Sequence, residues 1–396
     1  MSIPHQQQPT QGNPGALAAV LAYPFRIFFF SAALLATVSI PLWLALLLGK
    51  VDLPLAMPAL FWHQHEMMFG FLSAAIAGFL LTAVCVWTNT DRTHGWHLGL
   101  LWLVWLSGRL AVTLGGDLPA LLVHLVNFAF LPLVMWDAGR RIWQARQHKQ
   151  LMVLVVLGLL WAMQIGFSLS YDPQYMAGAL IVTLALISII GGRITPVFST
   201  NWLRQRGQTT ALPWQSARLD QITLATLILT VVATLMAPAW LTGGVALVAA
   251  ALTLVRLAGW RGWLVRKEPL LWVLHVSILW VPVALLLYAA HLLWHIPASA
   301  WLHAAGIGAM ASLILGVMAR VCLGHTGRPL VLPGGMVLAF VAIQLGALIR
   351  VLAALHWLPW TTGMLLGSLL WSLAFVIFLL RYTRILFSPR ADGRPG

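Results

Sequence analysis

Histidine is the residue that stands out in this sequence, because three apolar segments begin close to one. Trp62-His63-Gln64-His65-Glu66 opens one segment, His124 lies just inside another, and His303 opens a third. Neutral histidine is the commonest metal ligand, and ionisable groups inside an apolar segment are costly enough to indicate function. These residues predict a metal site, provided that the fold brings them together.

Side chains next to these histidines have the chemistry to complete such a site. Met67 and Met68 offer thioether ligands that suit Cu(I), although methionine in an apolar helix more often simply packs. Glu66 is a candidate catalytic residue as a proton relay, and it could also orient an imidazole or cap its own helix. Residues two apart on a helix point about 200° away from each other. His63 and His65 can therefore share one ion only if His63 lies in an extended segment before the helix begins. Otherwise they serve two centres, such as a haem and a copper.

Two arginines lie deep in apolar segments. Arg109 and Arg350 could each hold a carboxylate, such as a haem propionate, or an anion such as nitrite, through paired charge-assisted hydrogen bonds. Pairing with Asp117, Glu66 or backbone carbonyls explains them equally well.

Composition defines the elements that must position these residues. Among 396 residues 61% are apolar and 8% are charged, so most of the chain could not be solvated as a soluble domain. Twelve apolar stretches are each long enough, at about 1.5 Å per residue, to cross about 30 Å of hydrocarbon. We therefore expect an all-α polytopic membrane bundle. The expected spans are 24–49, 65–87, 96–114, 119–137, 151–169, 173–190, 218–238, 241–258, 271–290, 302–321, 331–354 and 362–386.

Arginine and lysine predict the orientation of the bundle, because positive charge is retained on the cytoplasmic side. Connections rich in these residues alternate with connections almost free of them. The basic side carries Arg140, Arg141, Arg146, Lys149, Arg193, Arg204, Arg206, Arg261, Arg266, Lys267, Arg328, Arg381, Arg384, Arg390 and Arg394. An even number of spans then puts both termini in the cytoplasm of a bacterial inner membrane. The formal charge of +14 reflects this asymmetry and attraction to anionic lipids, and nucleic acid is not an expected partner.

The ends of the chain differ in composition from the spans. Residues 1–22 are polar and rich in Gln, Pro and Gly, so we expect a disordered cytoplasmic tail there. A single twelve-helix domain is expected over 23–387, followed by a short basic tail over 388–396. The predicted orientation puts His63, His65, His124 and His303 in the periplasmic half of the membrane.

A repeated spacing links two of the histidine-bearing segments. The matching positions are His65, Gly70, Ala74 and Gly78 in one segment and His303, Gly308, Ser312 and Gly316 in the other. Small residues at every fourth position let a neighbouring helix or a flat macrocycle approach closely. A bis-histidine haem held by His65 and His303 would use this geometry. Ordinary helix packing is the simpler explanation of the small-residue stripes taken alone.

A second group of polar residues falls on the predicted cytoplasmic side. Gly191-Gly192-Arg193-Ile194-Thr195-Pro196 is expected to close the sixth span, and Arg320-Val321-Cys322-Leu323-Gly324-His325-Thr326-Gly327-Arg328 to close the tenth. Helix capping accounts for most of these residues. A second metal or proton-entry site on this side would use Arg193, His275, Arg320, His325 and Arg328.

Several motifs in this order resemble those of one family. The run from Trp62 to Gly70 that leads into Ala77-Gly78-Phe79-Leu80-Leu81-Thr82-Ala83-Val84, the run from Gly191 to Pro196, and Ala319-Arg320 with Gly324-His325-Thr326-Gly327-Arg328 look like the NnrS family. The resemblance covers about residues 22 to 385. The family is described as twelve-helix inner-membrane proteins that contain haem and copper and are associated with denitrification and the response to nitric oxide. The resemblance implies both cofactors and a role in nitrosative stress, but it does not supply the ligands.

We therefore expect a haem- and copper-binding membrane protein that binds or processes nitric oxide, with an electron donor that the sequence does not identify. An oxidoreductase activity would need protons as well, and the scarcity of intramembrane acids other than Glu66 disfavours a proton pump. A transporter of a small anion or metal is the alternative, because twelve helices, glycine-broken helix ends and buried arginines also suit that class. A sensor or metal-delivery protein without turnover is the third possibility.

Overall fold

The computed structural model describes residues 15–394, and this part of the chain is helical, with no strand. All twelve expected spans are present. The first six are α2 (Pro24–Leu47), α3 (Ala59–His65) with η1 (Glu66–Phe71) and α4 (Leu72–Thr88), α5 (Gly95–Leu114), α6 (Ala120–Phe128) with α7 (Phe130–Gln144), η2 (His148–Gln150) with α8 (Leu151–Ser170), and α9 (Pro173–Gln205). The last six are α10 (Ala217–Met236), α11 (Ala239–Trp260), α12 (Pro269–Trp294), α13 (Ala298–His303) with η4 (Ala304–Ala311) and α14 (Ser312–His325), α15 (Met336–Ala354) and α16 (Trp360–Leu386).

Several spans end at other residues than the sequence predicts, and three of these differences concern the candidate residues. The second span begins at Ala59 and the tenth at Ala298, each directly after a proline that caps the helix, so His63, His65 and His303 lie inside helices. The expectation that 191–196 closes the sixth span was wrong, because α9 continues to Gln205. Pro196 removes one backbone hydrogen bond from this helix, and a buried membrane helix tolerates such a loss when its neighbours and side chains compensate.

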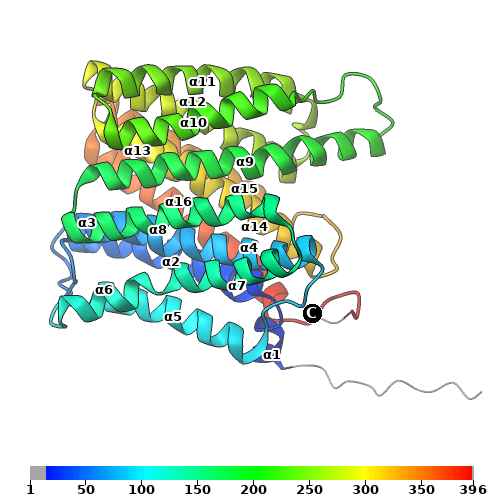
Figure 1. The fold of residues 1–396 in the computed structure, drawn as a ribbon, viewed down its shortest axis with the longest axis horizontal. Helices are drawn as coiled ribbons and strands as arrows, with labels where there is room; N and C mark the ends of the chain where they lie inside the picture. The colour runs from blue at the N-terminus through cyan, green and yellow to red at the C-terminus, as the bar shows by residue number, and fades with distance from the viewer. Residues whose placement is uncertain (1–14, 395–396) are drawn as a thin grey trace, which may run out of the picture.

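The helices run side by side along the long axis of the molecule, so that all connections lie at two faces (Figure 1). We call one of them the basic face, because its five connections between spans carry Arg92, Arg146, Arg206, Arg261, Arg266, Lys267 and Arg328. In the six described connections of the opposite face, Lys50 is the one lysine or arginine. The short helix α1 (Ala16–Val20) and the C-terminal end both lie at the basic face (Figure 1). The expected disordered tail falls mainly on residues 1–14, which lie outside the described residues. That the basic face is cytoplasmic stays a prediction.

The centre of the bundle is formed by every fourth span. In the second, sixth and tenth spans 78%, 78% and 67% of the most apolar stretch is buried, against 56% or less in the other described spans. Two of these three innermost spans carry the histidines at issue. Both also contain a wide π-helical turn, η1 and η4, that starts at the residue after His65 and after His303. Such turns are rare and recur at functional sites.

The small-residue stripes are helix contacts. A Cβ on Gly78 would lie 2.7 Å from the ring of Phe29 on α2, and one on Gly316 would lie 2.9 Å from Val273 on α12. Ser312 donates a hydrogen bond of 2.7 Å to Ser277, also on α12. Each stripe therefore packs on the span that precedes it in the chain, as the simpler explanation predicted.

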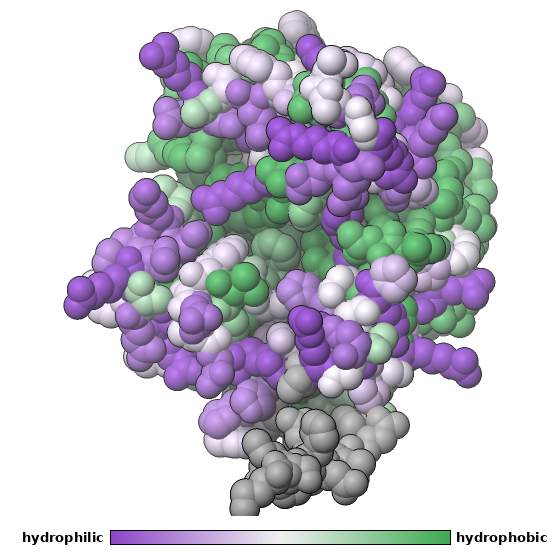
Figure 2. Space-filling model, turned by 90° about the vertical axis from the view of Figure 1, so that its right-hand side faces the viewer, coloured by the Kyte–Doolittle hydropathy of each residue, from purple (hydrophilic) through white to green (hydrophobic). Residues whose placement is uncertain are grey.

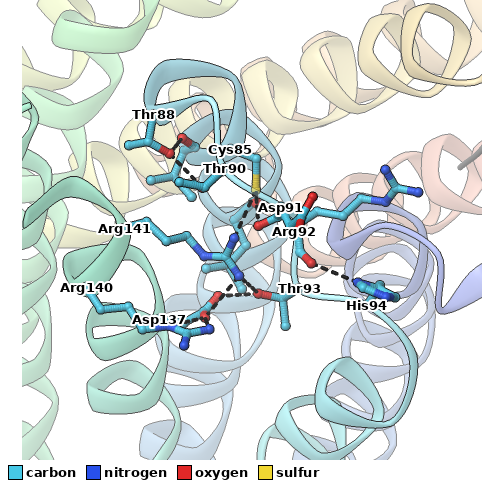
Figure 3. Close-up of polar contacts among 12 residues, drawn as sticks. Cys85, Thr88, Thr90, Asp91, Arg92, Thr93, His94, Asp137, Arg140 and Arg141 are labelled. Carbon is cyan, nitrogen blue, oxygen red and sulfur yellow. Dashed lines mark hydrogen bonds and ion pairs between the residues drawn. The ribbon is translucent and has the colours of Figure 1, made fainter. Parts of the chain in front are cut away.

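Polar side chains secure the connections at the basic face. Asp137 on α7 accepts hydrogen bonds from Thr93 and, at 3.4 Å, from Arg141 (Figure 3). Arg141 also donates to Thr93 at 2.7 Å, so the connection from α4 to α5 is fixed to α7. The basic face as a whole is ringed by hydrophilic side chains around a hydrophobic hollow (Figure 2).

The C-terminal segment is held on the same face. Arg390 donates to the His325 carbonyl at 3.1 Å, and the Ala391 amide donates to the Thr326 carbonyl at 3.0 Å. Arg390 also bonds Asp392, and its guanidinium lowers the pKa of that carboxyl to about 2. These contacts anchor the residues that follow α16 to the end of the tenth span.

Candidate functional site

A cavity of about 470 Å³ lies between the second, sixth and tenth spans and the neighbouring helices α2, α15 and α16, in the half of the bundle that ends at the opposite face. We call it the histidine cavity. Its volume falls in the range of about 300–1,000 Å³ that is usual for ligand pockets. Its lining includes His63, His303 and Arg350, together with Met67, Met68, Met176, Met310 and Met364.

His303 enters this cavity from the end of α13 with a defined tautomer. Its Nδ1 lies 2.7 Å from the carbonyl oxygen of Ser299, which only accepts, so Nδ1 carries the proton. Nε2 is then the acceptor, 3.2 Å from Nη2 of Arg350. A backbone carbonyl that accepts from one ring nitrogen and leaves the other nitrogen as an acceptor is the arrangement that orients histidine ligands in metal sites.

His63 enters the same cavity from α3. Its ring stacks on Trp43 of α2, with centroids 4.9 Å apart and an angle of 11° between the planes. Its Nδ1 is buried and has no hydrogen-bond partner among the described residues. A buried polar atom without a partner carries a desolvation cost that a ligand could remove.

Arg350 completes the polar part of the cavity. It is 7% exposed, and its guanidinium lies 4.6 Å from the ring centroid of Trp360. Its Nη1 is buried without a partner, and no carboxylate of the described residues forms an ion pair with it. A Cβ on Gly367 would lie 2.5 Å from the Arg350 side chain, so this glycine leaves room for the arginine. A buried, unpaired guanidinium favours an anionic group on whatever fills the cavity.

His65 lies in a separate network and does not line the histidine cavity. Its Nδ1 is 3.1 Å from Glu66 Oε1 and its Nε2 is 2.9 Å from the amide of Asn127, so both ring nitrogens are engaged. Arg109 donates to the same Glu66 oxygen and to Asn127 Oδ1, each at 2.8 Å. The expected pairing of His65 with His303 is therefore not the one that this geometry favours. Arg109 pairs with Glu66, one of its expected partners, and not with Asp117.

The repeated spacing explains why the two sites differ. If His303 is matched to His65, the residue matched to Glu66 is Ala304. Arg109 in the third span and Arg350 in the eleventh each lie beside the matched histidine-bearing turn. In the first copy of the repeated spacing, which begins at His65, Glu66 supplies a carboxylate to the arginine. In the second copy, which begins at His303, Ala304 supplies only a methyl group, and a cavity lies beside the arginine. The same chain thus contains one closed arginine site and one open arginine site.

Of the other predicted metal ligands, the two methionines lie in the histidine cavity and His124 does not. Met67 and Met68 line the histidine cavity beside His63. His124 is partly exposed, stacks on Phe128 with centroids 5.4 Å apart, and does not line this cavity. Among the described residues, no three His, Cys, Asp or Glu side chains gather in a way that could hold a metal ion.

The second group of predicted residues, near the basic face, is not assembled into one site. His275 bonds Ser199 at 2.9 Å, and the His325 ring packs against Phe25. Each of the three arginines has its own partner. Arg193 bonds Gln150 at 3.4 Å, Arg320 lies over the ring of Phe198, and Arg328 bonds the Thr326 carbonyl.

Sequence reasoning did not identify Asn127, Trp43 and Trp360 as neighbours of these sites. Asn127 lies in the middle of the fourth span, where an uncharged amide in an apolar helix is a usable signal. The tryptophans gave no such signal, because tryptophan near helix ends is typical of membrane interfaces.

Twelve apolar helices around buried histidines and arginines define a multi-pass membrane protein with a cavity between its helices. The NnrS protein family matches residues 19–390, nearly the whole chain, and the protein belongs to this family. Among curated proteins none matches the chain.

Proposed function

We propose that the protein is a haem- and copper-binding protein of the bacterial inner membrane that binds or processes nitric oxide in nitrosative-stress defence. The haem would be held in the histidine cavity, in the periplasmic half of the membrane. One observation carries this proposal: His63 and His303 reach a single cavity from two helices, beside an arginine that lacks a carboxylate.

The residues of the cavity fit a haem. The carbonyl of Ser299 fixes the His303 tautomer, so Nε2 would be free to ligate the iron once Arg350, which lies 3.2 Å from it, turned to a propionate. His63 lines the cavity from the second span and would be the second histidine at the haem. Arg350 is the partner for a propionate, which would supply the carboxylate that Ala304 does not. The aliphatic and aromatic residues of the lining would cover the macrocycle.

Copper is assigned to the methionine side of the same cavity. Met67 and Met68 line the cavity beside His63, and thioether ligands suit Cu(I). When bound, haem iron supplies a coordination position for nitric oxide and copper a second redox centre.

The polar residues around His65, outside the histidine cavity, form a neutral hydrogen-bonded network. Glu66 and Arg109 neutralise each other, and Asn127 holds the His65 ring. Glu66 remains the candidate proton relay, because its Oε2 is buried and accepts no hydrogen bond from the described residues.

The test is a reduced-minus-oxidised optical spectrum with metal analysis, recorded on the purified protein before and after addition of nitric oxide. We expect a haem band that shifts with nitric oxide, and copper in the same sample. His63→Ala and His303→Ala should each abolish or shift the haem spectrum, whereas His124→Ala, outside the cavity, should leave it unchanged.

Two results would contradict the proposal. Normal haem spectra in both folded cavity variants would remove His63 and His303 as ligands. A folded wild-type preparation without haem would refute the haem assignment and favour the transporter alternative.

A further inference from the structure

A second cavity of about 250 Å³ lies in the half of the bundle that ends at the basic face. We call it the apolar cavity. Its walls come from α4, α8, α9 and α14, with contributions from α2 and η4. Polar side chains in its lining are few: the Thr183 hydroxyl already donates to the Ala179 carbonyl, and Arg193 bonds Gln150.

The lining of this cavity selects for uncharged, apolar occupants. An ion or a strongly polar molecule would lose its hydration without gaining hydrogen bonds from Leu72, Ala75, Ile187 or Val317. Apolar cavities of this kind stay dry and bind small apolar molecules, xenon among them. The chemical class that fits is therefore a small neutral molecule such as a diatomic gas.

The apolar cavity continues the histidine cavity along the three innermost spans. On the second span the lining passes from Met68 to Leu72, and on the sixth from Leu180 to Thr183. These steps of four and three residues correspond to about 6 and 4.5 Å of helix rise. On the tenth span Met310 lines both cavities. The two cavities meet at a flexible, apolar side chain.

We propose that the apolar cavity takes up a small neutral gas from the basic-face half of the membrane and passes it by Met310 to the histidine cavity. This assignment rests on the proposed function for the destination, but the uptake of gas by the cavity does not depend on haem. The hydrophobic hollow in the basic face lies at the end of the bundle nearer to this cavity (Figure 2).

Xenon in pressurised crystals of the full-length protein tests uptake. We expect a xenon peak within the apolar cavity of the wild type. Ala75→Phe, which places a ring in the cavity from α4, and Val317→Phe, which places one from α14, should each remove it. Val86→Phe is the matched control, because Val86 lies on the same helix as Ala75 but is 71% exposed. Xenon peaks elsewhere with none in the wild-type cavity would overturn the proposal.

The rate at which carbon monoxide recombines with reduced haem after flash photolysis tests whether gas passes from the apolar cavity to the histidine cavity. Slower combination by several-fold is expected in Ala75→Phe and Val317→Phe, with an unchanged haem spectrum, and no change in Val86→Phe. Wild-type rates in both filled variants, despite loss of the xenon peak, would overturn the passage. A preparation without haem would refute the proposed function, and the xenon result alone would then decide whether the cavity takes up gas.

Discussion

Replacing Glu66 with alanine should destabilise the protein strongly, because it leaves a buried guanidinium without its counter-ion. Glu66 Oε1 lies 2.8 Å from Arg109 Nη1 and 3.1 Å from His65 Nδ1. The side chains of Glu66 and Arg109 are 1% and 7% exposed, so water cannot replace the lost carboxylate. Breaking a buried ion pair from one side typically costs about 3–5 kcal/mol. We expect a loss of that size in the free energy of unfolding.

The matched comparison is Asp220→Ala, which removes the partner of Arg256. That pair is 2.5 Å apart, and the Arg256 side chain is 8% exposed, but the Asp220 side chain is 32% exposed, so water can take the place of the lost carboxylate. Arg256 also keeps its hydrogen bond of 3.0 Å to the Ser188 carbonyl, and the expected loss is about 1 kcal/mol. The free energy of unfolding can be measured by titrating the protein in detergent micelles with dodecyl sulfate and following helix content by circular dichroism. The two single variants should differ by at least about 2 kcal/mol, the gap between these two ranges.

A double variant separates the effect of charge from the effect of packing. Glu66→Gln with Arg109→Met removes both charges and keeps most of the volume, and such replacements are often neutral. We expect the double variant to be more stable than Glu66→Ala alone. If Glu66→Ala costs no more than Asp220→Ala, or if the double variant is the less stable one, the argument from buried charge is refuted.

Two further substitutions test the same pair of sites. Gly70→Ala places a Cβ 2.8 Å from Arg109 Nη1 and should cost about 1–3 kcal/mol of unfolding free energy through overpacking. Gly244→Ala in α11, with open space around its Cβ, should cost nothing in the same titration. Ala304→Glu places a carboxylate beside Arg350, as Glu66 is placed beside Arg109. This carboxylate would compete with a propionate for Arg350, so the haem content per folded protein should fall. Unchanged haem content in that variant would contradict the assignment of Arg350 to a propionate.

The fold was predictable because each span is a long apolar run, and its length and composition suffice to identify it. The ends were less predictable at the second and tenth spans, where the capping prolines Pro58 and Pro297 lie several residues before the expected start. At the sixth span, glycine and proline between 191 and 196 predict the end of the helix, although burial on several sides keeps the helix intact.

The site was predictable in its residue types but not in its pairing. Spacing identified His65 and His303 as equivalent, and they do lie at equivalent turns. Spacing could not show that Asn127, from a distant span, occupies the second nitrogen of His65. Nor could it show that His63, on another side of the same helix, reaches the cavity of His303. A π-helical turn also shifts the faces of a helix, so a wheel drawn with α-helical geometry misplaces the residues on either side of it.

The two wide turns have a mechanical consequence. Each innermost histidine-bearing span consists of a short outer helix, α3 or α13, joined to a longer inner helix, α4 or α14, through a π-helical turn that interrupts the regular α-helical hydrogen-bond pattern. His63 and His303 lie on the short outer helices, whereas the part of the apolar-cavity wall that these two spans supply belongs mainly to the inner helices. If the proposed haem binds, this division would let the outer helices adjust their angle to it while the inner helices keep their packing.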